Sequence, residues 1–160
     1  MTFRFRIDGR LDVLLGSLVY DPREYSFRFE RGESALSEAG VTSLSIGTLQ
    51  IEVDVASGRV LYVWGLHPHG RWQEGHAVPN DVIRGGVQVL ADPPLVSGVS
   101  LAVAAAGEWV TTHDPVSGWV HVYPLDWAGD GVQVEVADDT LLGIEGDRLT
   151  SLWLKPSQGL

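Results

Sequence analysis

Hydrophobic and polar residues alternate along most of this chain, and this period-two pattern constrains the fold more than any other feature. The segment 3–7, FRFRI, puts its three apolar side chains on one side and its two arginines on the other. The segments 25–29, 49–55 and 132–136 repeat the scheme. Successive side chains of a strand point to opposite faces, so the pattern is typical of half-buried strands in an antiparallel sheet.

The breaks between the alternating segments consist of turn-forming residues. The Asp-Gly pair at 8–9 is a dipeptide typical of two-residue hairpins. The segments 54–60 and 114–120 share the pattern Asp-x-x-Ser-Gly-x-Val. In both, we expect the Asp side chain to cap the turn and Gly58 or Gly118 to adopt a positive φ before the next strand begins.

Signals for helices are few. The segment 33–40, ESALSEAG, predicts one or two helical turns, whereas we interpret the Ala-rich segment 101–107 as a strand because strand-like segments flank it. The chain has 160 residues, and no linker or low-complexity tract divides it. We therefore predict one all-β domain over residues 1–160, with about ten to twelve short strands and at most one short helix. It would be an antiparallel β-sandwich or a partly closed barrel.

The composition excludes several classes of protein. The chain has no cysteine, which excludes disulfide scaffolds, thiolate metal sites and cysteine nucleophiles. No apolar segment is long enough to span a membrane, and the first residues lack the features of a signal peptide. We therefore expect a cytoplasmic protein that does not associate with membranes.

The chain is strongly acidic. Twenty-one acidic residues stand against eleven basic ones, and the formal net charge is −10. The segment 125–147 holds seven acidic residues and no basic one. Such a surface repels nucleic acid and attracts a basic protein. The alternative is that the charge serves solubility alone.

The segment 66–79, LHPHGRWQEGHAVP, predicts an irregular loop because proline and glycine interrupt it. A loop of this length is often functional, and Trp and Arg are over-represented among residues that dominate interfaces. We expect His69, Arg71, Trp72 and His76 to contact a partner. The alternative is a solvated surface loop.

A second candidate surface lies in the segment 118–131, where aromatic residues lie close to acidic ones in the sequence. Aromatic side chains beside carboxylates suit a basic partner. The alternative is that the aromatic residues belong to the core. The expected contacts are Trp119, Tyr123, Asp126, Trp127 and Asp130.

The histidines also offer a possible metal site. His67 and His69 are two residues apart, Glu74 follows, and His121 lies after a predicted hairpin turn. Imidazole and carboxylate ligands suit iron, manganese, nickel or zinc. The arrangement resembles the two motifs of the cupin family, whose members are metal-binding β-barrels.

The resemblance to cupins implies that His67, His69, Glu74 and His121 bind one metal ion in an enzyme or a sugar-binding protein. The sequence departs from the family pattern at several positions. Leu61 stands where the first motif has its leading glycine. Pro68, between the two histidines, has no N–H to donate within a sheet.

No complete catalytic set is present. The chain lacks a nucleophile elbow, a P-loop and a dinucleotide-binding fingerprint. Our leading hypothesis is therefore a non-enzymatic protein, without metal or cofactor, that recognises a basic protein, as an immunity protein or inhibitor does. The cupin-like metal protein is the alternative, and a small-molecule binder with a pocket at one end of the fold is a third. A homodimer through an exposed sheet edge also remains open.

Overall fold

Strands form nearly all of the regular structure. A computed structural model describes residues 2–31 and 40–158, and within them fifteen strands form three sheets. The helical structure in these residues is one short 3-10 helix, η1 (His69–Arg71). The described residues contain no helix of the length and hydrophobicity needed to cross a membrane. The all-β prediction is confirmed, and the helix expected over 33–40 lies, apart from Gly40, outside the described residues.

The first sheet has six strands in the order β10-β4-β5-β6-β3-β2. All neighbours are antiparallel except β10, which runs parallel to β4. The strand predicted over 101–107 is thus confirmed for its first four residues, whereas 105–107 form a turn. The strands are β2 (Gly16–Asp21), β3 (Ser26–Arg31), β4 (Val41–Ile46), β5 (Leu49–Asp54), β6 (Val60–Leu66) and β10 (Leu101–Ala104).

The second sheet has seven strands in the order β7-β11-β12-β15-β14-β13-β8. Its two outermost strands are short and run parallel to their neighbours, which raises the number of strands above the expected ten to twelve. The strands are β7 (Gln73–Glu74), β8 (Val82–Arg84), β11 (Trp109–His113), β12 (Val120–Pro124), β13 (Val132–Ala137), β14 (Thr140–Glu145) and β15 (Arg148–Leu154). Neither sheet closes into a barrel, so the fold is a sandwich.

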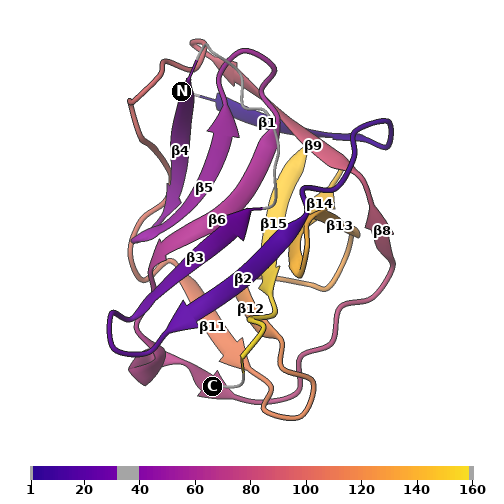
Figure 1. Cartoon of the computed structure of the whole chain (residues 1–160). Helices are drawn as coiled ribbons and strands as arrows, with labels where there is room; N and C mark the ends of the chain where they lie inside the picture. Colours follow the sequence, from indigo (N-terminus) through magenta and orange to yellow (C-terminus); the bar gives the residue numbers. More distant parts are fainter. Residues whose placement is uncertain (1, 32–39, 159–160) are drawn as a thin grey trace.

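A two-stranded ribbon crosses one end of the sandwich (Figure 1). It pairs β1 (Thr2–Asp8) with β9 (Gly86–Asp92). The prediction of a hairpin at Asp8-Gly9, in which β1 would pair with the segment that follows it, is therefore wrong. The turn does form, with the Asp8 carboxylate accepting hydrogen bonds from the backbone and side chain of Arg10. The chain then leaves the ribbon, and Leu14 pairs beside β13 instead of returning along β1.

The main core lies between the two large sheets. The alternating segments point their apolar residues inward, as expected, so that Phe27, Leu44 and Ile51 on the first sheet face the same core as Val122 and Leu152 on the second. The two Asp-x-x-Ser-Gly turns also form as predicted. Positive φ angles of 74° and 84° occur at the glycines of these turns.

A second, smaller core covers the outer face of the second sheet. Leu141 and Trp153 point to this face from β14 and β15. Trp119, Trp127 and Ala77 pack on them from the flanking loops. Strand β15 is thus buried on both faces. Half of the six tryptophans lie in this outer core.

Candidate functional site

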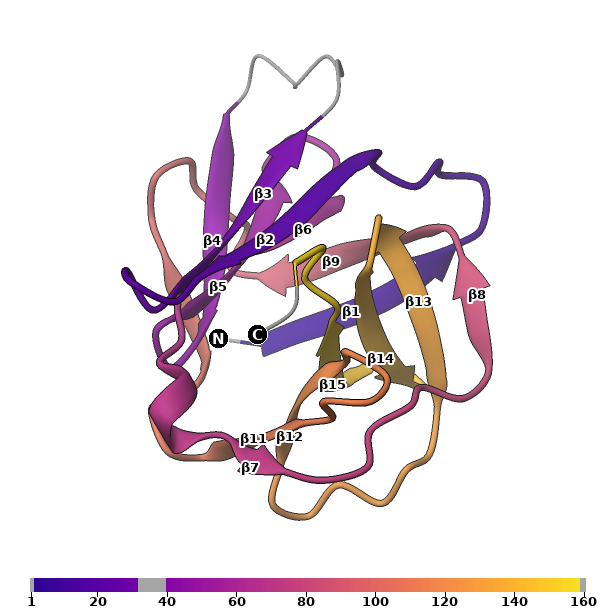
Figure 2. The same ribbon diagram turned by 60° about the horizontal axis from the view of Figure 1, so that its bottom comes forward.

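The segment 66–79 carries the chain from the first sheet to the second. Figure 2 brings this end of the molecule forward, where η1 leads into β7 beside β11. The segment is more ordered than the irregular loop expected from its sequence. Pro68 precedes η1, and the backbone N–H of Trp72 donates to the His69 carbonyl at 3.1 Å to close the turn.

Trp72 is the centre of an aromatic cluster at this end of the sandwich. Its indole stacks on Phe27, with 6.0 Å between ring centroids, and contacts the edge of Tyr20 at 5.0 Å. The imidazoles of His67 and His113 lie 5.5 and 6.0 Å from it. These residues come from four separate elements, so the cluster forms only when the two sheets are in place.

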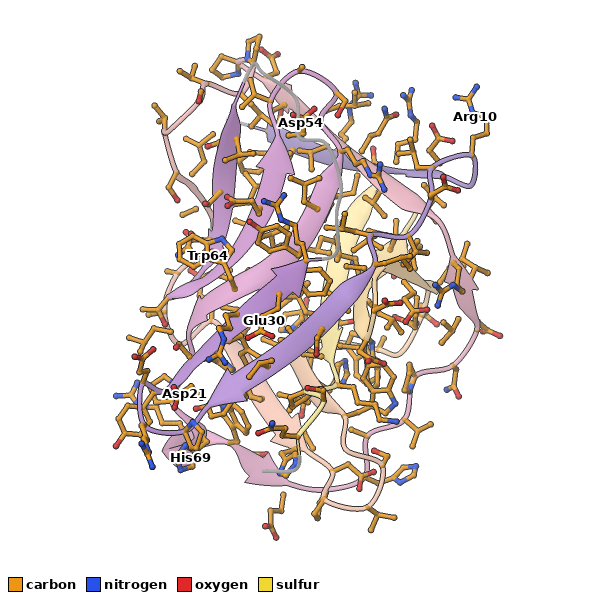
Figure 3. The ribbon with its side chains drawn as sticks, viewed as in Figure 1. Arg10, Asp21, Glu30, Asp54, Trp64 and His69 are labelled. Carbon is orange, nitrogen blue, oxygen red and sulfur yellow. The ribbon has the colours of Figure 1, made fainter. Side chains whose placement is uncertain are left out.

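The hydroxyl of Tyr20 holds the backbone that precedes Trp72. It donates to the His67 carbonyl at 2.8 Å and accepts the backbone N–H of His69 at 3.1 Å. Burial raises the pKa of Tyr20 above its ordinary value, so the phenol stays protonated and remains a donor. His69 contacts this hydroxyl through Nδ1 as well, at 3.3 Å. In Figure 3, His69 lies beside the turn that follows Asp21.

A cavity of about 400 Å³ opens beside this cluster, and we call it the Glu74 cavity. Among residues 2–31 and 40–158, Glu74 on β7 is the only carboxylate that lines it, and the other lining residues are uncharged or histidines. Aromatic residues and one acidic residue of the described chain therefore line the same cavity. The cavity is lined by Tyr20, Pro22, His69, Trp72, Glu74, His113 and Gln158.

The four residues of the cupin-like motif do not converge. The Nε2 atom of His67 lies 2.7 Å from the hydroxyl of Thr111, and burial lowers the pKa of His67 to about 4. His121 neighbours Thr112 and points to the other face of the second sheet. Residues 2–31 and 40–158 contain no group of three or more His, Asp or Glu side chains placed to hold a metal ion. The geometry therefore does not support the cupin-like site.

The aromatic residues expected to form a second binding surface mostly pack inward instead. Trp119 and Trp127 are half-buried in the outer core. Tyr123 is also half-buried, and its hydroxyl lies 2.8 Å from that of Thr112. The alternative, that the aromatic residues of this segment belong to a core, therefore describes them better.

The acidic segment divides into exposed and paired parts. Asp126 and Asp130 are exposed on the loop after β12. Glu135 pairs with Arg84 at 2.6 Å, and Asp138 lies 3.6 Å from the same guanidinium. Within the acidic segment 125–147, Asp126 and Asp130 are therefore exposed, whereas Glu135 and Asp138 lie close to Arg84.

The two remaining candidate residues lie outside the Glu74 cavity. The side chain of His76 is 88% exposed and lies 3.6 Å from the Asp114 carboxylate. The Ala77 N–H, together with N–H groups of the following turn, donates to this carboxylate and lowers the pKa of Asp114 to about 2. Arg71 lines a different cavity, of which Trp72 is also a lining residue.

Two important residues of the Glu74 cavity were not identified from the sequence. Tyr20 ends the short apolar run 18–20 and looks like a core residue. His113 lies opposite Glu74 in the sheet only because β7 and β11 are parallel neighbours. No local sequence pattern indicates that these two strands pair. A search for aromatic residues at strand ends would have found Tyr20, whereas His113 carries no signal of its own.

Comparison with known proteins adds no relative. No protein-family model matches this sequence, and no curated protein matches it. The function is therefore inferred from the geometry of the chain.

Proposed function

We propose that the protein binds a basic protein and that the Glu74 cavity receives a lysine or arginine side chain of that partner. The observation that carries the proposal is the pairing of one carboxylate with several aromatic rings in a single cavity. Cations are attracted to the faces of Trp and Tyr rings, and an opposite charge at the same site adds a charge-assisted hydrogen bond.

The whole-molecule charge supports the same partner. A net charge of −10 attracts a basic protein over a distance and accelerates its association. Exposed Asp126 and Asp130, together with exposed His76, extend the polar surface beyond the cavity. An immunity protein or inhibitor that neutralises a basic protein in the cytoplasm is one concrete form of this function.

The first test measures binding of three short peptides by two-dimensional NMR. The probes are acetyl-Gly-Arg-Gly-amide and its lysine and citrulline counterparts. The arginine and lysine side chains are positively charged, whereas that of citrulline is neutral. We expect the two charged peptides to shift the amide signals of Glu74 and Gln158, and citrulline to bind at least several-fold more weakly. Equal binding of all three would contradict a cation site.

The matched variants are Glu74→Gln and Glu145→Gln, each of which removes one negative charge. Glu145 is exposed at the end of β14 and does not line the cavity. We expect Glu74→Gln to weaken binding of the arginine peptide about tenfold, the effect of losing one charge-assisted hydrogen bond. Glu145→Gln should change it little. Equal effects of the two variants would mean that only the overall charge attracts the peptide.

A further inference from the structure

A second cavity shares Trp72 as a lining residue with the Glu74 cavity. Its volume is about 270 Å³, and we call it the Arg71 cavity. Buried Ile46 and Val122 belong to the main core and line it from both sheets. The turn between β10 and β11 lines it as well, through the residues 105–107.

The cavity is large enough for a small organic molecule. A closed apolar cavity of about 150 Å³ is known to accept benzene. The Arg71 cavity exceeds that volume, and Trp72, Trp109 and Val110 give it apolar walls. Such walls favour a ring or a short branched chain and disfavour a ligand with many polar groups.

Of the described residues that line the cavity, Arg71 alone carries a formal charge at neutral pH. None of them is acidic, and His67 is uncharged there because burial lowers its pKa to about 4. The His67 imidazole and the Thr111 hydroxyl also satisfy each other. Across residues 2–31 and 40–158, no carboxylate lies within ion-pair distance of Arg71. Exposed Glu108 follows the 105–107 turn but does not line the cavity.

We propose that the Arg71 cavity binds a small aromatic monocarboxylate, with its ring between the apolar walls and its carboxylate on the Arg71 guanidinium. The forked donors of arginine match the two oxygens of a carboxylate. The site differs in charge and position from the Glu74 cavity, so this inference does not depend on the proposed basic partner.

The experiment compares three probes that share a phenyl ring: phenylacetate, 2-phenylethanol and phenethylamine. Their binding is followed by amide NMR shifts of the full chain. We expect phenylacetate to shift Thr48 and Gly107, which line the Arg71 cavity, and to bind more tightly than the alcohol. Phenethylamine should be the weakest of the three at these residues.

Two variants test the residues directly. Arg71→Gln should weaken phenylacetate binding about tenfold and leave the alcohol unchanged, since only the carboxylate loses a charged partner. Arg148→Gln is the control, because Arg148 is exposed at the start of β15 and does not line the cavity. Ala106→Phe places a ring into the cavity from an exposed turn and should abolish binding of phenylacetate and the alcohol.

Three results would overturn the inference. The first is that no probe shifts the lining amides up to its solubility limit. The second is that phenylacetate binds no more tightly than 2-phenylethanol. The third is that Ala106→Phe, folded as judged by its spectrum, still binds phenylacetate as the wild type does.

Discussion

The imidazole of His121 lies nearly parallel to the indole of Trp153, with 3.5 Å between ring centroids. Tyr123 and Trp127 contact it at 4.4 and 4.5 Å. Burial lowers the pKa of His121 to about 3, because no charged or polar group compensates the loss of water around the protonated ring. At neutral pH this histidine is therefore an uncharged packing residue, like the aromatic rings around it.

His121 should make the fold sensitive to acid. Its ordinary pKa is 6.5, whereas the folded chain protonates it only near pH 3. Between these values the unfolded chain binds more protons, so the free energy of unfolding decreases as the pH falls from 6.5 towards 3. His121→Phe keeps a ring and removes this titration. We expect its acid-unfolding midpoint, measured by circular dichroism, to lie at a lower pH than that of the wild type.

The control is the same substitution at an exposed histidine, His76→Phe. Its imidazole is already in contact with water, so we expect a smaller change of the midpoint. If His121→Phe leaves the midpoint where it is, protonation of His121 does not limit stability in acid.

At the scale of elements, the edges of the two large sheets are short or covered. An exposed edge strand invites pairing with another chain. The edge strands β7, β8 and β10 have only two, three and four residues. The longer edge strand β2 is covered by the segment after β15, in which the backbone N–H of Ser157 donates to the Leu18 carbonyl at 2.8 Å. This segment therefore connects the second sheet to the edge strand of the first.

The contact between Ser157 and β2 can be tested with two substitutions. Ser157→Pro removes the N–H donor, and we expect it to lower the free energy of unfolding by about 0.5–1.5 kcal/mol, the usual net contribution of one hydrogen bond. Ser157→Ala keeps the donor and should change stability by less than about 0.5 kcal/mol. Urea denaturation measures both. Equal stability of the two variants would show that the hydrogen bond contributes nothing.

The strands themselves could be predicted, but many of their partners could not. Alternation and turn chemistry are local, which is why the strands and the turns at Gly58 and Gly118 form as expected. Pairing between distant segments leaves no such local trace, and the missed β1–β9 ribbon is an example. The same limit applies to the candidate site. His69 and Trp72 were identified from composition, whereas Tyr20 and His113 join them through the fold.

At the scale of the whole molecule, neighbouring residues of one strand serve different cores. Val122 and Leu152 point into the main core, while His121 and Trp153, next to them in sequence, point into the outer one. The β1–β9 ribbon is bonded to both large sheets, through the Asp147 and Gly58 carbonyls. The two cores therefore depend on the same backbone.

We expect the whole chain to unfold in one transition. Tryptophan fluorescence reports mainly on the outer core and the Trp72 cluster, and amide signals of Leu44 and Ile51 report on the first sheet. Both should be lost at the same urea concentration, because breaking either core disorders strands that the other requires. Separate transitions would mean that the outer core is an independent unit.

Trp72 is a wall of both cavities at once. A ligand that displaces this indole from one cavity would also alter a wall of the other, so two ligands that never touch would still sense each other. Thermodynamic reciprocity requires that each change the affinity of the other by the same factor. A small carboxylate in the Arg71 cavity would then set how firmly the protein holds a basic partner at the Glu74 cavity.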